Sequence, residues 1–345
     1  MGTLMLIGGG VASSDPKRQR LFEHMRQAAG GETPRLAILS SSIKDVQTVY
    51  DHFYKVEPKV GSFEINYRTL GFEPVFIPLA VDNAEVVKND PKWAEVLAKC
   101  DGAYLQGGNQ YNHVMSLLNR DGSPSLLLDA LSTILNRGGV VAGTSAGMAA
   151  MGDVAFGEGT SKGALHANGL EWRTVSQLYD VDALITAVPY NNLAVQGIGL
   201  VPHGILLDTH FDKRGRLGRL MIAMRDTNSM YGIGVDERTC LSLRDMKGEV
   251  IGEHGVFIID ASQAVFLKGS HFAVKNLKVF YLTEGDQFDF SSGKAFEGCG
   301  EVLIDETEIS EVIAEDCEIK IRFIKRAHDS KSRENEAVEL FMDVF

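Results

Sequence analysis

Short apolar runs alternate with helix-like stretches through the first 142 residues of the chain, and this alternation admits few folds. The helix-like stretches carry apolar residues near helical spacing at Lys17–Ala29, Val114–Leu118 and Leu126–Leu135. Strands that alternate with helices form a mostly parallel sheet covered on both faces, and functional residues then gather at the carboxyl ends of the strands. We therefore expect a three-layer α/β fold. The expected strands are Leu4–Ile7, Arg35–Ser40, Pro74–Pro78, Gly102–Gln106 and Gly139–Ala142.

Past Gly199 the pattern changes to strands with few helices between them. Ile205–His210 and Tyr231–Glu237 are expected to be strands on either side of a helix at Leu217–Met224. No linker rich in Pro or Ser divides this part of the chain from the first part, so we expect the later strands to add antiparallel edges to one sheet. These later strands are expected at Gly255–Asp260, Ala264–Lys268, Lys278–Leu282 and Cys317–Lys325.

The chain is expected to form one main domain with a short extension. Residues 1–300 would make the main α/β domain, and residues 301–345 an extension of a strand and a short helix packed on the same domain. That helix is predicted at Lys331–Phe345, with Val338, Phe341 and Phe345 on one side. Core packing and a subunit contact would both explain this apolar side, and we favour packing.

Composition excludes several classes of function. The 345 residues carry a net charge of −12, which disfavours nucleic acid as a partner. No apolar run approaches the roughly 18 residues of a membrane span, and the first run passes directly into three glycines without the basic leader of a signal peptide. The sequence has no HExxH or CxxC motif, so we expect no metal and no cofactor. We expect a cytoplasmic protein with reduced, mostly buried cysteines at Cys100, Cys240, Cys299 and Cys317.

The sharpest chemical signal is a GxSxG motif at residues 143–147. It follows an apolar strand and precedes a helix-compatible segment, so Ser145 must sit on a tight turn that its small neighbours permit. Such a turn exposes the serine hydroxyl at the carboxyl edge of the sheet. It also places the Ala146 N–H at a helix N-terminus, where it can stabilise an oxyanion. We favour a nucleophile over a purely structural turn.

A serine nucleophile needs a base, and His210 is the best placed of the nine histidines. It ends an expected strand and therefore lies at the same edge as Ser145. The next strand brings Asp236 and Glu237 to that edge. Adjacent residues face opposite ways, so only one of these carboxylates can orient His210, and strand geometry alone does not say which.

Three arginines open the helix that follows His210, at Arg214, Arg216 and Arg219. Cations at a helix N-terminus oppose the helix dipole, and several together in an acidic protein suggest an anionic partner. Arginine suits substrate carboxylates because its guanidinium binds them in a bidentate way. The alternative is internal pairing with Asp208, Asp212 or neighbouring carboxylates.

Two glycine segments follow strands at the same edge. Gly107 and Gly108 could let a backbone N–H approach a ligand as a second oxyanion donor, and a plain turn is the equal alternative. The run at residues 8–10 lacks the full GxGxxG pattern and a P-loop lysine, so we interpret it as a turn.

Taken together, four motifs resemble the cyanophycinases of serine peptidase family S51. They are Gly-Thr-Ser-Ala-Gly, Gly-Gly-x-Gln, Asp-x-His-Phe followed by Arg-Gly-Arg-x-x-Arg, and Gly-Ile-Gly-Val-Asp-Glu. They occur in the family's order, and the resemblance covers about residues 3–290. It implies a fold similar to class I glutamine amidotransferases, which is flavodoxin-like, with serine in place of their cysteine.

The resemblance also implies roles for particular residues. The triad would be Ser145, His210 and Glu237, which resolves the choice between the two carboxylates. Gly108 and Ala146 would be the oxyanion donors. Cyanophycin is a poly-aspartate with arginine on each β-carboxyl group, and enzymes of this kind release β-Asp-Arg dipeptides from it through an acyl-enzyme. The family also favours a homodimer. The expected substrate-binding residues are Gln110, Asp208, Thr209, Arg214, Arg216 and Arg219.

Two features depart from the family pattern. Thr209 stands where glutamine is expected in Asp-Gln-His-Phe, and the stretch from Ser145 to His210 is longer than usual around Glu158–Asn192. The added stretch could form a lid or a subunit contact through Trp172, Tyr179 and Tyr190. The alternatives to a cyanophycinase are therefore a related peptidase for other aspartyl or isoaspartyl peptides, and a non-catalytic amidotransferase-like module that binds an anion.

Overall fold

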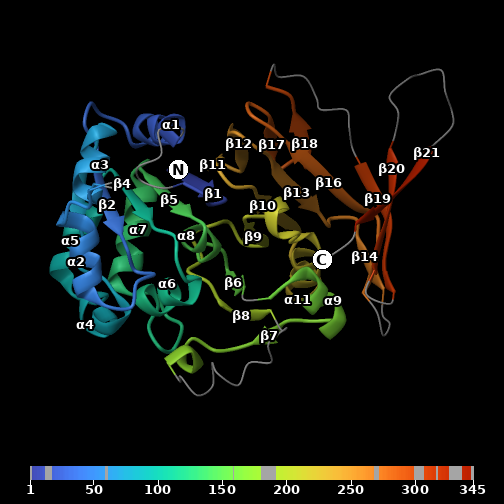
Figure 1. Ribbon diagram of the computed structural model, residues 1–345, viewed down its shortest axis with the longest axis horizontal. Helices are drawn as coiled ribbons and strands as arrows, with labels where there is room; N and C mark the ends of the chain where they lie inside the picture. Colours follow the sequence, from blue (N-terminus) through green and yellow to red (C-terminus); the bar gives the residue numbers. More distant parts are fainter. Residues whose placement is uncertain are drawn as a thin grey trace.

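The chain is built on two large sheets, as the computed structural model in Figure 1 shows. The structure describes residues 2–11, 18–58, 61–157, 159–179, 192–267 and 272–298, together with the backbone of strands at 307–315, 318–325 and 336–342. The helices of the N-terminal half gather around the first sheet at the left of the figure, and the last strands lie at the right. A mixed α/β fold is thereby confirmed.

The first sheet contains all five strands expected from the N-terminal half. Its order is β18-β17-β12-β11-β1-β5-β4-β2-β3, and the part from β1 to β3 is parallel. The parallel strands are β1 (Thr3–Ile7), β2 (Arg35–Leu39), β3 (Glu73–Phe76), β4 (Gly102–Leu105) and β5 (Val140–Thr144). The antiparallel strands are β11 (Thr239–Arg244), β12 (Lys247–Gly252), β17 (Gln287–Asp289) and β18 (Lys294–Phe296).

Helices cover both faces of the parallel part of this sheet, which explains why β1, β2, β4 and β5 are mostly apolar and buried. Met5 and Ile7 of β1 belong to a core with α1 (Gln19–Ala29), α2 (Val46–Tyr54) and α3 (Phe63–Thr69). Leu4 and Leu6 belong to a core on the other face, since successive side chains of a strand alternate. The helices on that face are α4 (Ala84–Val87), α5 (Pro91–Ala98), α6 (Gln110–Leu117) and α7 (Leu126–Asn136).

The expectation of a single sheet is wrong, although later strands do add antiparallel edges, as expected. Strands β9 (Ile205–Thr209) and β10 (Tyr231–Val235) are parallel neighbours in a second sheet, whose order is β14-β15-β19-β16-β13-β10-β9. The reason is that β11 occupies the edge of β1 that these strands would have needed. The other members are β13 (Val256–Asp260), β14 (Val265–Leu267), β15 (Ala273–Lys275), β16 (Leu277–Leu282) and β19 (Thr307–Glu315).

The short helix predicted at the end of the chain is also wrong. Residues Glu336–Met342 form strand β21, which pairs antiparallel with β20 (Glu318–Lys325), and β20 in turn pairs with β19. The edge of β20 offers a row of backbone partners, and these favour an extended segment over an isolated short helix. The ends of the Lys331–Phe345 segment lie outside the described residues.

A small third sheet lies in the stretch between Ser145 and His210. It consists of β6 (Val154–Gly157), β8 (Leu193–Gln196) and β7 (Glu171–Trp172), with α9 (Ser161–Ala167) between β6 and β7. Sequence analysis did not predict these strands. After β9 comes α11 (Leu217–Thr227), as expected. None of the helices in the described part of the chain is long and apolar enough to cross a membrane.

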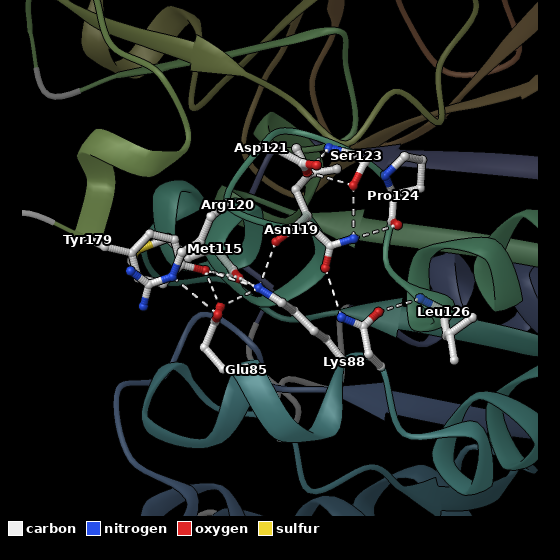
Figure 2. Close-up of polar contacts among 12 residues, drawn as sticks. Glu85, Lys88, Met115, Asn119, Arg120, Asp121, Ser123, Pro124, Leu126 and Tyr179 are labelled. Carbon is white, nitrogen blue, oxygen red and sulfur yellow. Dashed lines mark hydrogen bonds and ion pairs between the residues drawn. The ribbon is translucent and has the colours of Figure 1, made fainter.

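Tyr179, within the added stretch, contacts the helices of the first sheet, as Figure 2 shows. It ends the short helix η3 (Ser176–Tyr179), and its hydroxyl lies 2.8 Å from the Met115 carbonyl oxygen. Lys88, which is 1% exposed, donates to the Tyr179 hydroxyl at 3.1 Å and to Glu85 at 2.6 Å. The Arg120 guanidinium stacks on the Tyr179 ring at 4.2 Å. These contacts hold Tyr179 in place. Glu158 and Tyr190 lie outside the described residues.

Two of the four cysteines can be placed. Cys100 and Cys240 are free thiols in the two cores, as predicted. Burial raises the pKa of the Cys100 thiol to about 11, so it stays protonated and unreactive at neutral pH. Cys299 and Cys317 lie outside the described residues.

Candidate active site

Ser145 lies on a tight turn between β5 and the short helix α8 (Ala146–Ala149). Its φ of 51° is rare for a residue with a side chain, and its neighbours must be small for the turn to close. A Cβ atom on Gly143 would lie 2.6 Å from the Gly147 carbonyl carbon, and one on Gly147 would lie 2.3 Å from the Leu105 carbonyl oxygen. The glycines of the motif are thus a steric requirement of the turn.

His210 lies between Ser145 and Glu237. Its Nε2 is 2.6 Å from the Ser145 Oγ, and its Nδ1 is 2.8 Å from the Glu237 Oε1. A carboxylate can only accept a hydrogen bond, so the neutral imidazole carries its proton on Nδ1. Nε2 is then left to accept the proton of the Ser145 hydroxyl. The three side chains form one continuous hydrogen-bonded chain, although they come from different sheets.

Asp236, the other carboxylate at this edge, faces away from His210. It accepts hydrogen bonds from the Asp212 N–H at 2.9 Å and, at 3.5 Å, from the Tyr281 hydroxyl. Burial raises the pKa of the Asp236 carboxyl. The ambiguity left by strand geometry arose because β10 ends at Val235, so both acids lie in the turn that follows it.

The charges around His210 favour a neutral imidazole at neutral pH. Burial lowers its pKa, the Glu237 hydrogen bond opposes this, and the cations of Arg214 and Arg216 lower it further. Lys213 donates to the second oxygen of Glu237 at 2.8 Å, and this hydrogen bond holds the pKa of Glu237 below its usual value. Together these groups keep an ionised carboxylate behind an unprotonated base.

The glycines at residues 8–10 bend the chain after β1, and they also shape the site. Gly9 has a φ of +114°, and a Cβ atom there would lie 2.3 Å from the imidazole Cε1 of His210. The carbonyls of Ile7, Gly8 and Gly9 accept in turn from the N–H groups of Ser145 at 2.9 Å, His210 at 2.8 Å and Arg238 at 2.7 Å. The sequence signal was present as three glycines directly after a buried strand, but we interpreted it as a turn alone.

Gly108 and Ala146 both line the cavity beside Ser145. Ala146 is the first residue of α8, so its N–H has no acceptor within the helix. Gly108 has a φ of +142°, and in the described part of the chain its N–H donates to no other group. Both groups are therefore available to stabilise negative charge next to Ser145.

The cavity has a volume of about 550 Å³ and is lined mainly by polar groups. Gln110 lies against Gly157, where a Cβ atom would come within 2.0 Å of the Gln110 amide nitrogen. Apart from Glu237, which stands behind His210, every residue predicted for the site lines this cavity. These are Gly108, Gln110, Ser145, Ala146, Asp208, Thr209, His210, Arg214, Arg216 and Arg219.

The three arginines of the cavity are not equivalent. Arg219 is 1% exposed and makes a two-point contact with Asp208, at 2.6 Å from Nε and 2.5 Å from Nη2. Arg216 donates to Asp208 at 3.1 Å and to the Thr209 hydroxyl at 3.2 Å. Arg214 is exposed, and it forms no ion pair with any carboxylate among the residues that the structure describes. Internal pairing with Asp208 thus accounts for Arg216 and Arg219. The lining of the cavity holds three arginine cations and one carboxylate, so its charge is positive in excess.

The fold and the site define a hydrolase-like α/β protein with a serine, a histidine and a carboxylate in hydrogen-bond contact. Residues 4–251 match the model of peptidase family S51, and the chain belongs to this family. It is thus a peptidase, and its substrates are peptides. None of the described groups of His, Cys, Asp and Glu could hold a metal ion.

Several cyanophycinases are relatives of the chain at low identity. The cyanophycinase of Synechococcus elongatus is 24% identical over 305 residues, which is 86% of this chain and 82% of the relative. That of Trichormus variabilis is 26% identical over 295 residues, or 83% and 85% of the two chains. The crystal structure of a peptidase from an acI-B1 Actinobacterium matches with a TM-score of 0.56 at 20% identity, and covers 84% of this chain and 97% of that one. The structural match supports the fold.

Proposed function

We propose that the chain is a serine peptidase of cyanophycinase type, which releases β-Asp-Arg dipeptides from cyanophycin. The observation that carries this proposal is the hydrogen-bonded chain from Ser145 through His210 to Glu237, with distances of 2.6 Å and 2.8 Å, beside a cavity with an excess of positive charge. The relatedness to cyanophycinases at 24–26% identity supports the choice of substrate.

The proposed mechanism uses the protein's own groups only. Ser145 Oγ attacks a backbone carbonyl of the substrate while His210 Nε2 takes the hydroxyl proton, and Glu237 stabilises the imidazolium that forms. The N–H groups of Gly108 and Ala146 stabilise the oxyanion. His210 then gives its proton to the leaving amine. Water then attacks the acyl carbonyl while His210 Nε2 takes its proton, and His210 gives that proton to Ser145 Oγ as the bond between the serine and the acyl group breaks.

The substrate is expected to bind through its charges. Arg214 would hold a substrate carboxylate, because it is the cation of the cavity whose charge no carboxylate in the described residues neutralises. Arg216 and Arg219 would act as one unit with Asp208, and Thr209 and Gln110 would offer hydrogen bonds to the substrate's amide groups. The proposal also includes a location in the cytoplasm and a homodimeric state. Light scattering on the purified protein would test the homodimer.

One observation favours a second candidate, a peptidase for other aspartyl or isoaspartyl dipeptides. Thr209 replaces the expected glutamine, and its short side chain is already bonded to Arg216 at 3.2 Å. A shorter and internally satisfied side chain offers the substrate less reach than glutamine would. The difference would change which peptide binds and leave the reaction at Ser145 unchanged.

The proposal is tested by incubating purified protein with insoluble cyanophycin and following β-Asp-Arg by mass spectrometry. Ser145→Ala is the test variant. Ser242→Ala is the matched control, because Ser242 Oγ also contacts a histidine, His24 at 3.0 Å, in a groove distant in the fold from the cavity. In parallel, each protein is treated with a fluorophosphonate that labels activated serines.

Three outcomes separate the candidates. Dipeptide release by wild type and Ser242→Ala, but not by Ser145→Ala, supports the full proposal. Labelling of Ser145 without release from cyanophycin favours the second candidate. A folded wild-type protein that neither labels nor releases dipeptide would leave the anion-binding module as the better hypothesis.

A further inference from the structure

The loop that carries Gly108 is held by two buried side chains. It joins β4 to α6, and its carbonyl groups at Gln106 and Gly107 both accept hydrogen bonds from the protein interior. His113 Nε2 donates to the Gln106 oxygen at 2.8 Å, and Ser42 Oγ donates to the Gly107 oxygen at 2.7 Å. Two successive carbonyls are therefore each fixed by a side chain from elsewhere in the fold.

The bond to Gly107 also determines where the Gly108 N–H points. In a planar trans peptide the carbonyl and the following N–H lie on opposite sides of the chain, and the described residues contain no cis peptide bond. Because the Gly107 carbonyl is directed at Ser42, the Gly108 N–H is directed the other way. Gly108 lines the cavity with Ser145, whereas Ser42 and Gly107 do not.

Without that bond the peptide would have little to hold it. Two adjacent glycines adopt most backbone conformations at small cost, so the Gly107–Gly108 peptide could rotate. A rotated peptide would present its carbonyl oxygen to the oxyanion and repel it. The contact with Ser42 is close as well, since a Cβ atom on Gly108 would lie 2.5 Å from the Ser42 Oγ.

Ser42 is itself well fixed. It is 5% exposed, and its own carbonyl accepts from the Asn112 side chain at 2.6 Å. The neighbouring Ser41 hydroxyl contacts His113 Nδ1 at 2.7 Å. Burial lowers the pKa of His113 to about 4, so this histidine is neutral at neutral pH and keeps donating to the Gln106 carbonyl. The loop thus rests on α6 and on the segment after β2.

We infer that Ser42 is a positioning residue for the reaction at Ser145, which sets the Gly107–Gly108 peptide so that the Gly108 N–H meets the oxyanion. This inference rests on the proposed serine mechanism. It predicts an effect on the chemical step and not on substrate binding, because Ser42 lies outside the cavity.

The test compares three variants of the full chain. Ser42→Ala removes the hydroxyl, Ser42→Thr keeps it, and Ser125→Ala is a matched control. Ser125 is also a buried serine whose hydroxyl bonds backbone, at 3.3 Å to the Leu128 N–H, but it caps α7 away from the loop. For each we measure kcat and KM for dipeptide release, the rate of fluorophosphonate labelling, and the thermal unfolding midpoint.

Loss of one oxyanion donor costs about 10²- to 10³-fold in kcat, so a misplaced donor should cost about 10- to 10²-fold. We expect this loss in Ser42→Ala with KM unchanged, a parallel fall in the labelling rate, and kcat within a few-fold of wild type in Ser42→Thr and Ser125→Ala. The inference is overturned if Ser42→Ala keeps wild-type kcat and labelling, or if Ser125→Ala loses as much. If cyanophycin is not cleaved, labelling still decides between these results. A wild-type protein that neither cleaves nor labels overturns the proposed function, and this inference falls with it.

Discussion

Two of the serine–histidine pairs in the described part of the chain are nearly equal in length but differ in their surroundings. Ser145 and His210 are 2.6 Å apart, and Ser41 and His113 are 2.7 Å apart. In the first pair the second ring nitrogen meets the carboxylate of Glu237, and the pair borders a cavity. In the second pair that nitrogen meets a backbone carbonyl, and the imidazole is 0% exposed.

This difference separates a candidate nucleophile from a structural contact. A carboxylate stabilises the imidazolium that forms when a serine gives up its proton, whereas a neutral carbonyl in a buried setting does so far less. Burial lowers the pKa of His113 to about 4, and the hydrogen bond to the Gln106 carbonyl opposes this only in part, so that imidazole resists a proton. A short distance between a serine and a histidine is therefore insufficient evidence of catalysis, and the third group decides.

The largest expected effect is on kcat, and it comes from removing the carboxylate behind His210, so that its second ring nitrogen meets a neutral group as that of His113 does. Glu237→Gln keeps the shape of the side chain but removes the charge behind His210, and it can donate to Nδ1 and so favour the wrong tautomer. We expect kcat to fall by about 10³- to 10⁴-fold. Asp236→Asn is the matched control, since Asp236 is adjacent but bonds to other groups. Equal losses of kcat in Glu237→Gln and Asp236→Asn would mean that activity depends on the shape of the turn and not on the carboxylate of Glu237.

A smaller effect is expected on stability from the second pair. His113→Leu leaves the buried Ser41 hydroxyl and the half-buried Gln106 carbonyl without these partners, so the free energy of unfolding should fall by about 2–4 kcal/mol. His210→Ala, at the edge of the cavity, should cost less than about 1 kcal/mol. Urea unfolding measures both. Equal costs would show that His113 is no more structural than His210.

The stability difference between wild type and His113→Leu should also depend on pH. The pKa of His113 is about 4 in the folded protein and about 6.5 when unfolded. Between these values the unfolded chain binds a proton that the folded one does not, so wild-type stability is lost as pH falls through this window. His113→Leu has no such group and does not lose stability in this way. The difference in unfolding free energy between wild type and variant should therefore narrow as the pH falls from 6.5 to 4.

The smallest effect is expected from Lys213, which bonds the second oxygen of Glu237 and is 69% exposed. Activity needs neutral His210, so it should fall at low pH. Removing a nearby cation in Lys213→Ala should raise the pKa of His210 and move this fall to higher pH. Because solvent screens an exposed pair, we expect only about a twofold loss of rate on the acid side. The effect should vanish in high salt, and an unchanged profile at low salt would contradict it.

The sequence predicted what depends on local pattern. The strand, tight turn and helix around Ser145 follow from neighbouring residues, and so does the placement of His210 after a strand. The second sheet did not follow, because it depends on β11 pairing with β1 across more than 230 residues of chain. Spacing likewise could not reveal that His113 contacts Ser41, 72 positions away, or that Gly9 supports His210.

The three carbonyls at residues 7–9 have a consequence for synthesis on the ribosome. They anchor segments that emerge long after them, near residues 145, 210 and 238. A nascent chain that ends before His210 has Ser145 without its hydrogen-bonded histidine, and one that ends before Glu237 still lacks the carboxylate behind that histidine. Hydrolytic competence would therefore be acquired late in translation, after about two thirds of the chain has been made, and the unfinished peptidase could not act on itself or on its neighbours.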